Sequence, residues 1–224
     1  ANGTMVMTQD LSGLIYMATV SKYYLNFNGT TQYASLSSPS SYAYNSSFTI
    51  ECWVNTSVVP TVNNQTYPIL IKHNAYGLVL RMELNRPYFA YWDFGTNSMG
   101  GGGPIPQIGV WYHIAYVSNQ GLYVNGVLSA TGSFSTTSQN WPLQIGVDVS
   151  MNNLSNVILN QFTGSINEIR VWNIQRTQLD ISNNMNVSLS PSTPNLMGYW
   201  TFKEGAGSVL YNSINGGDNF TLYN

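Results

Sequence analysis

Charge is what this sequence lacks most. Only 7% of its 224 residues are charged, whereas roughly a quarter is usual in soluble proteins, and the formal net charge is −2. The 7 basic residues are scattered along the chain without forming a run. A nucleic-acid-binding surface or a polybasic membrane patch needs clustered Lys and Arg to meet phosphate groups. The composition therefore argues against nucleic acid and against an anionic membrane surface as partners.

Cysteine and long apolar segments are also scarce. The one cysteine, Cys52, cannot form an intrachain disulfide, and its place in the strand-like run FTIECWV predicts a small buried side chain. No apolar run is long enough to predict a membrane-spanning helix. The opening segment lacks the basic stretch of a signal peptide, and its wholly apolar part is only LIYMATV. A chain beginning ANGT suits an exported product whose signal has been removed, so an extracellular location is expected.

Uncharged polar residues take the place of the missing charges. The sequence has 27 asparagines, and eight of them stand in Asn-X-Ser/Thr sequons, the acceptor pattern for N-linked glycans. Attached glycans would solvate a surface that has few charges. We therefore predict a glycoprotein modified at Asn2, Asn28, Asn45, Asn55, Asn64, Asn153, Asn186 and Asn219.

Apolar and polar residues alternate with the period of β-strands through most of the chain. The clearest signal is LYVNGVLSA, in which Asn125-Gly126 is a pair favoured in type I′ hairpins. More than ten such short runs are separated by Gly, Pro, Asn and Ser, which predicts a two-sheet sandwich. One helix is predicted at 177–186, where Thr177 and Asp180 resemble a capping box, and NSMGGGGPIP at 97–106 is predicted to be a loop.

Six motifs follow one another in a familiar order. They are YYLNFNGTTQYASLSSPSSYAYNSSFTIECWV, ILIKHNAYGLVLRMEL, WYHIAYVSNQGLYVNGVLSATGSF, PLQIGV, FTGSINEIRVWNIQRTQLDI and LMGYWTFKEGAGSVLYNSINGGDNFTLYN. Over residues 23–224 the chain resembles the laminin-G-like/pentraxin-like group of concanavalin A-like jelly-roll domains. The resemblance implies an all-β, two-sheet antiparallel jelly-roll sandwich, and the alternation of residues 4–20 predicts an extra N-terminal strand in front of it. We expect residues 1–22 to form an N-terminal arm and 23–224 a single jelly-roll domain.

The resemblance also bears on ligands. Many members of the group bind sugars, matrix proteins or cell surfaces, and some use calcium. Members often carry an acidic residue where this chain has Asn125, Asn167 and Asn212. Because calcium affinity depends on the number of charged carboxylates, we predict no cofactor and at most weak calcium binding, with Asp148 and Asp218 as the remaining candidates.

Some relatives on this fold are glycosidases, which need two carboxylates across the scissile bond. The acidic residues of the strand-like runs each stand alone, and the same-face neighbour of Glu168 is Arg170, which predicts a structural ion pair. His73 and His113 have no nucleophile beside them in the sequence and are separated too widely for a metal-binding pattern. The sequence therefore predicts a non-enzymatic protein. The solitary acidic residues are Glu51, Glu83, Asp93, Glu168 and Glu204.

Aromatic residues favour binding over catalysis, because Tyr and Trp supply flat faces that stack on sugar rings. Trp141, in the turn-like SQNWPL, is the aromatic residue expected to be exposed, and it is the candidate glycan contact. Changes in loop 97–106 are also expected to affect glycan binding. The tryptophans within strand patterns are expected in the core: Trp53, Trp111, Trp172 and Trp200.

The segment TMVMTQDLSGLIYMATV at 4–20 alternates like a strand and precedes the recognisable domain. One alternative is an edge strand of its own sheet. The other is a donor strand that completes a neighbouring subunit and links subunits head to tail into a filament. Its predicted subunit-contact residues are Met5, Met7, Leu11, Ile15 and Met17.

Two functions follow from these alternatives. The first is a non-enzymatic extracellular structural or adhesive glycoprotein that self-assembles into a surface filament through its N-terminal strand. The second is a carbohydrate-binding lectin module on a cell surface or virion. The predicted partners are accordingly other copies of the chain and glycans.

Overall fold

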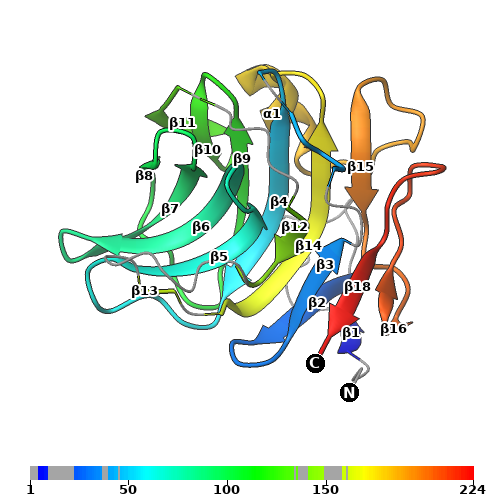
Figure 1. Cartoon of the computed structure of the whole chain (residues 1–224), viewed down its shortest axis with the longest axis horizontal. Coiled ribbons are helices and arrows are strands. Elements are labelled where there is room, and N and C mark those ends of the chain that lie inside the picture. The colour runs from blue at the N-terminus through cyan, green and yellow to red at the C-terminus, as the bar shows by residue number, and fades with distance from the viewer. Residues whose placement is uncertain are drawn as a thin grey trace.

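The fold is taken from a computed structural model of the chain (Figure 1). The structure describes residues 5–9, 23–36, 40–44, 46–133, 135, 141–148, 158–159 and 161–224, and within 5–9 and 158–159 only the backbone. Two nine-stranded sheets make up the molecule, and all strand pairings are antiparallel except one. The predicted all-β jelly-roll sandwich is confirmed.

The first sheet runs in the order β11-β10-β9-β4-β14-β2-β1-β16, and β15 pairs with β14 beside this path. Its strands are β1 (Met5–Gln9), β2 (Tyr23–Asn28), β4 (Thr49–Thr56), β9 (Trp111–Val117), β10 (Gly121–Val124), β11 (Val127–Thr131), β14 (Thr163–Trp172), β15 (Leu196–Trp200) and β16 (Ala206–Gly207).

The second sheet runs in the order β17-β18-β3-β12-β5-β6-β7-β8, and β13 pairs in parallel with β5. Its strands are β3 (Tyr33–Leu36), β5 (Gln65–Lys72), β6 (Tyr76–Glu83), β7 (Arg86–Asp93), β8 (Ser98–Gly102), β12 (Leu143–Ile145), β13 (Ile158–Leu159), β17 (Val209–Leu210) and β18 (Phe220–Tyr223).

The core fills the space between the two sheets. In β4 the alternate residues Ile50, Cys52 and Val54 face it and are fully buried, which confirms Cys52 as a core side chain. Aromatic rings join the sheets: Tyr91 of β7 stacks on Tyr116 of β9 with ring centroids 4.6 Å apart. Each fully buried large apolar side chain stabilises the fold by about 1.5–3 kcal/mol, so this layer dominates stability.

Two local predictions are confirmed. Asn125 and Gly126 both have positive φ, 50° and 77°, as a type I′ turn between β10 and β11 requires. Helix α1 (Gln178–Asn184) begins after Thr177, whose side chain and that of Asp180 form a reciprocal capping box. In the described part of the chain, no helix is long and apolar enough to span a membrane.

The prediction of a loop at 97–106 is wrong for its first half, because Ser98–Gly102 forms β8 and pairs with β7 along its whole length. Glycine runs are poor strand formers in isolation. Here the rings of Tyr88 and Tyr91 occupy the space that side chains at 100 and 101 would need. A Cβ at Gly100 would lie 2.5 Å from the Tyr91 ring, and one at Gly101 would lie 2.4 Å from the Tyr88 ring.

The first strand, β1, pairs within its own chain. Met7, Thr8 and Gln9 stand opposite residues of β2, and Met5 and Val6 stand opposite residues of β16, all antiparallel. For residues 5–9 the structure therefore matches the edge-strand alternative. The donor-strand residues Leu11, Ile15 and Met17 lie outside the described residues, and the domain boundary at 22/23 stays a prediction.

Candidate functional site

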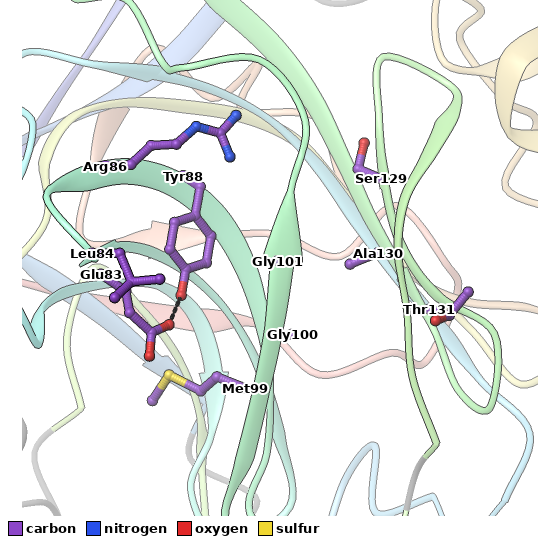
Figure 2. Close-up of a pocket in the computed structure, with 10 residues that line it drawn as sticks. All are labelled: Glu83, Leu84, Arg86, Tyr88, Met99, Gly100, Gly101, Ser129, Ala130 and Thr131. Atoms are coloured by element: carbon purple, nitrogen blue, oxygen red, sulfur yellow. Dashed lines mark hydrogen bonds between the residues drawn. The ribbon is translucent and has the colours of Figure 1, made fainter.

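A groove of about 600 Å³ opens where β8, at the edge of the second sheet, lies beside β11, at the edge of the first. Figure 2 shows Glu83, Tyr88 and Arg86 on one side of β8 and residues of β11 on the other. The lining residues are Glu83, Leu84, Arg86, Tyr88, Met99, Gly100, Gly101, Ser129, Ala130 and Thr131. This volume lies within the roughly 300–1,000 Å³ typical of small-ligand sites.

Glycines form the middle of the groove. Gly100 and Gly101 place backbone, not side chains, between its two walls, and β8 has no paired strand on the edge that faces β11. A Cβ at the next residue, Gly102, would come 2.6 Å from the Ser129 carbonyl oxygen of β11. The small size of Gly102 therefore allows the two sheet edges to approach, while Gly100 and Gly101 stay partly exposed.

The charged side chains of the groove come from the β6–β7 hairpin. Glu83 and Arg86 are register partners across its turn, and Tyr88 follows two residues later on the same face as Arg86. The Tyr88 hydroxyl donates a hydrogen bond to Glu83 Oε2. Burial, together with the Glu83 carboxylate, raises the pKa of Tyr88 to about 12, so the phenol stays a donor at neutral pH.

Sequence reasoning did not find this group. The turn residues Leu84 and Asn85 both have positive φ, 49° and 59°, so the hairpin is of the same type as Asn125-Gly126. Reading Asn85 as a turn signal would have placed Glu83 opposite Arg86. The wall from β11 could not be predicted from the local sequence, because β11 belongs to the other sheet.

Trp141 lies at a second place, and 38% of its surface is accessible, which confirms its predicted exposure, although Tyr211 is the more exposed aromatic residue at 58%. Its ring meets the His73 ring edge-on with centroids 5.0 Å apart, and His73 Nδ1 lies 3.1 Å from Asp148 Oδ2. The ammonium of Lys72 donates to the Trp141 carbonyl at 2.7 Å, and burial lowers the pKa of Lys72 to about 8. Trp141 is thus an exposed ring that packs against His73, and its backbone carbonyl accepts a hydrogen bond from Lys72.

The other tryptophans mostly follow the prediction. Trp53, Trp172 and Trp200 are buried, as is Trp92, whereas Trp111 is only partly covered and packs edge-on against Tyr24.

The residues considered for calcium are engaged in other contacts. The side-chain oxygens of Asn125, Asn167 and Asn212 accept hydrogen bonds from backbone N–H groups. Asp148 faces His73, and Asp218 accepts a hydrogen bond from the Ser41 hydroxyl. Among the residues that the structure describes, no three His, Cys, Asp or Glu side chains gather as metal ligands would.

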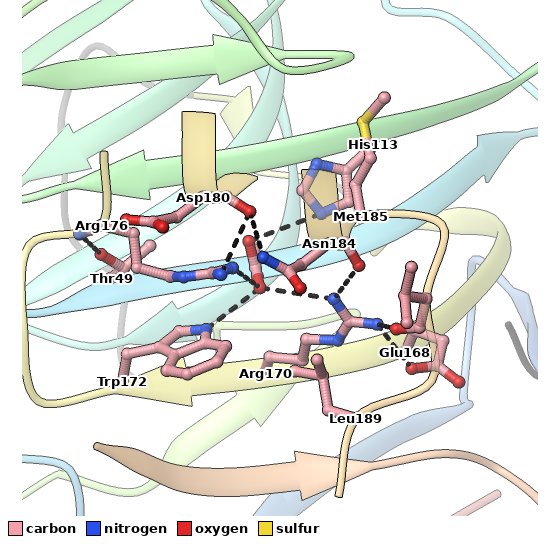
Figure 3. A network of polar contacts seen from close by, with 12 residues as sticks. Thr49, His113, Glu168, Arg170, Trp172, Arg176, Asp180, Asn184, Met185 and Leu189 are labelled. Carbon is pink, nitrogen blue, oxygen red and sulfur yellow. Dashed lines mark hydrogen bonds and ion pairs between the residues drawn. The ribbon is translucent and has the colours of Figure 1, made fainter. Parts of the chain in front are cut away.

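A network of charged side chains lies on the outer face of the first sheet, beneath α1 (Figure 3). Glu51 Oε1 accepts from Trp172 Nε1 at 3.0 Å and from Arg176 Nη1 at 3.1 Å, and Arg170 Nη1 lies 3.6 Å away. His113 Nε2 lies 3.6 Å from Glu51 Oε2. Glu51, His113 and Arg170 are far apart in the sequence, and pairing of β4 with β9 and β14 brings them together.

This network holds the α1 segment to the sheet. Arg170 donates to the carbonyls of Asn184 and Val187, and Arg176 donates to the carbonyl of Asp180. The predicted ion pair is confirmed, since Arg170 Nη2 lies 3.2 Å from Glu168 Oε2. Every one of these side chains is buried, so the network is part of the scaffold and offers no surface to a ligand.

The predicted glycosylation sites fall into groups. Asn28, Asn64 and Asn219 are exposed, whereas Asn55, within β4, and Asn186 are partly covered. The remaining three, Asn2, Asn45 and Asn153, lie outside the described residues, and the modification itself stays a prediction.

Several solved structures of other proteins have a similar fold. A protein from Bacteroides ovatus, provisionally assigned as carbohydrate binding, is similar with a TM-score of 0.65 and 20% identity; the match covers 88% of this chain and 58% of that one. Domain 4 of an extracellular GH43 arabinanase from Geobacillus stearothermophilus, in complex with arabinotriose, gives a TM-score of 0.54 and 18% identity over 81% of each chain.

A Trypanosoma rangeli sialidase gives a TM-score of 0.50 and 17% identity, covering 74% of this chain and 29% of that one. At these identities the similarity shows the fold alone. No curated protein sequence gives a significant match. Residues 28–182 match the family model Laminin_G_3, described as the concanavalin A-like lectin/glucanases superfamily, and the chain therefore belongs to that family.

Proposed function

We propose that this chain is a carbohydrate-binding module and that the groove between β8 and β11 is its binding site. The observation that carries the proposal is the combination of Glu83, Arg86 and Tyr88 beside a glycine backbone in one groove. Carboxylate, guanidinium and phenol groups supply acceptors and donors for the hydroxyls of a sugar. The carbohydrate-binding assignments of similar folds, one holding arabinotriose, support the same class of ligand.

Trp141 is the second proposed glycan contact. An exposed indole can stack on the apolar face of a sugar ring, and the edge-on contact with His73 orients the Trp141 ring. The groove supplies hydrogen bonds and Trp141 supplies a flat face, so the two contacts can be tested separately.

Binding without catalysis is part of the proposal. Among the described residues that line the groove, Glu83 is the one carboxylate, and glycoside hydrolysis canonically requires two. We also propose that the module acts outside the cell as a glycoprotein, with the exposed Asn28, Asn64 and Asn219 as its best-placed acceptors.

Self-assembly into a filament by strand donation is the weaker candidate, because β1 pairs with β2 and β16 of its own chain. Adhesion through a bound glycan does not need that step. Electron micrographs of the purified chain test this candidate. Filaments that disappear when residues 1–20 are deleted would support strand donation.

The test is a glycan array probed with the labelled chain and with Thr131→Trp, which adds bulk to the groove. We expect the wild type to bind a defined set of glycans and Thr131→Trp to lose at least about tenfold in affinity. Val127→Trp is the matched control, since Val127 lies exposed on the same strand but does not line the groove. Trp141→Ala reports on the second contact.

Absence of binding to every glycan would contradict the proposed function. Binding that survives Thr131→Trp but is lost in Trp141→Ala would move the site from the groove to Trp141. Turnover of any bound glycan would contradict the non-enzymatic part.

A further inference from the structure

We infer that the groove selects saccharides that carry a carboxylate, such as uronic or sialic acid residues, and that Arg86 is the residue that binds it. This inference rests on the proposed function and narrows it from sugars in general to acidic sugars. It starts from the different surroundings of the arginines in this chain.

Three of the four arginines already have a carboxylate partner. Arg170 and Arg176 reach Glu51 at 3.6 and 3.1 Å, and Arg81 Nε lies 4.0 Å from Glu83 Oε2. In the described part of the chain Arg86 forms no ion pair, and its one hydrogen bond is donated by Nη2 to the Gly103 carbonyl. Since a guanidinium has five N–H donors, most of those of Arg86 remain available in the groove.

The register partner of Arg86 does not neutralise it. Glu83 stands opposite Arg86 across the hairpin, but Glu83 Oε2 accepts a hydrogen bond from the Tyr88 hydroxyl and faces Arg81. Arg81 is itself held in place, because Nη2 donates to Asn64 Oδ1 at 2.9 Å and Nη1 to Thr66 Oγ1 at 3.3 Å. The groove and its rim thus carry two guanidinium groups and one carboxylate, an excess of one positive charge on a chain with net charge −2.

The geometry of the Arg86 guanidinium suits a carboxylate. A planar guanidinium matches a planar carboxylate with two parallel N–H···O bonds, which gives both strength and orientation. The bond to the Gly103 carbonyl fixes one end of the Arg86 fork before ligand arrives, so less side-chain entropy is lost on binding. Glu83 then disfavours the reverse orientation, because a ligand carboxylate placed against it would be repelled, whereas a hydroxyl could donate to it.

The test uses an array of oligosaccharides that end in glucuronic, galacturonic or N-acetylneuraminic acid, each beside its carboxyl-reduced counterpart. Affinity for the strongest acidic ligand is then measured by titration calorimetry for the wild type, Arg86→Gln, Arg86→Lys and Lys203→Gln. Lys203 is exposed and does not line the groove, so Lys203→Gln removes one positive charge elsewhere on the chain.

We expect the acidic ligand to bind at least about tenfold more tightly than its reduced counterpart, and Arg86→Gln to abolish that preference. Arg86→Lys should recover part of it, because the charge returns without the bidentate fork, and Lys203→Gln should leave it unchanged. Circular dichroism of each variant separates loss of binding from loss of fold.

The failures are distinguishable. Equal binding of acidic and reduced ligands, or an acid preference that persists in Arg86→Gln, would overturn this inference while the proposed carbohydrate function stands. An acid preference lost equally in Lys203→Gln would also overturn it, because net charge and not the groove would be responsible. Binding to no member of either series or of the wider array would overturn the proposed function as well.

Discussion

His113 lies in the middle of β9 with its imidazole beside the Glu51 carboxylate, and it links the stability of the fold to pH. Burial lowers the pKa of His113 to about 4, with Arg170 and Arg176 acting in the same direction and Glu51 opposing them. Since an unfolded histidine titrates near 6.5, the unfolded chain binds a proton between about pH 6.5 and 4 that the folded chain does not. Folding therefore favours the neutral imidazole.

Above about pH 6.5 we expect His113 to have no effect on how the free energy of unfolding changes with pH. As the pH drops from about 6.5 toward 4, that free energy should fall by up to about 3 kcal/mol. Urea titrations at pH 7.5, 6, 5 and 4.5 measure this fall. His113→Gln should flatten the curve over that range, whatever its absolute stability. A variant whose stability falls as steeply as that of the wild type would contradict the assignment.

Residue-scale features were the hardest to predict from sequence. Glu168 and Arg170 were correctly paired because they stand two positions apart on one strand. Arg86 and Glu83 were not connected, although they are register partners, because the hairpin between them was not recognised. Trp141 was correctly expected to be exposed, since a turn-like sequence precedes it and a proline follows it.

Helix α1 is the element that covers the buried charges, so its first turn matters more than that of an isolated surface helix. The Asp180 backbone N–H donates to Thr177 Oγ1 at 3.1 Å, and the Thr177 hydroxyl donates to Asp180 Oδ2 at 2.7 Å. Arg176, the residue before the cap, reaches both Glu51 and the Asp180 carbonyl. The cap therefore orients an arginine of the network.

Thr177→Ala is expected to lower the free energy of unfolding by about 1 kcal/mol, the usual cost of losing an N-cap. Ser182→Ala, in the same helix, is the control. In the described part of the chain the Ser182 hydroxyl bonds only to the Leu179 carbonyl, so its loss should cost a few tenths of a kcal/mol or less. Denaturant unfolding measures the free energy of unfolding of the two variants. Equal stabilities would show that the capping box contributes nothing.

At the scale of elements, most strands follow from alternation and turn residues, and β8 does not. Strand propensity predicts a loop for a run of glycines, because glycine has no side chain to pack and loses the most backbone entropy. The strand forms because Tyr88 and Tyr91 place their rings where glycine leaves space. That compensation comes from the neighbouring strand and is invisible in the segment itself.

At the scale of the whole molecule, β1 tests the two functional alternatives. If β1 completes its own sheet, the intact chain should be monomeric, and deleting residues 1–9 should expose the edges of β2 and β16. We expect that deletion to cost at least about 2 kcal/mol in lost strand pairing and to promote aggregation.

Light scattering after size exclusion, together with urea unfolding, measures both effects. Deletion of residues 1–4 alone, which leaves β1 intact, is the matched control and should behave as the wild type. A polymeric wild type that becomes a stable monomer on deletion of 1–9 would instead support strand donation.

By itself the sequence determined the fold class, the β10–β11 turn, the capped helix and the exposure of Trp141, because alternation, turn conformation and capping are properties of neighbouring residues. Only the tertiary structure decided that His113, Arg170 and Arg176 lie around the Glu51 carboxylate beneath α1. It also decided that a glycine strand from one sheet meets β11 of the other and leaves a groove between them. Contacts between sheets depend on how distant strands pack, and no spacing along the chain encodes them.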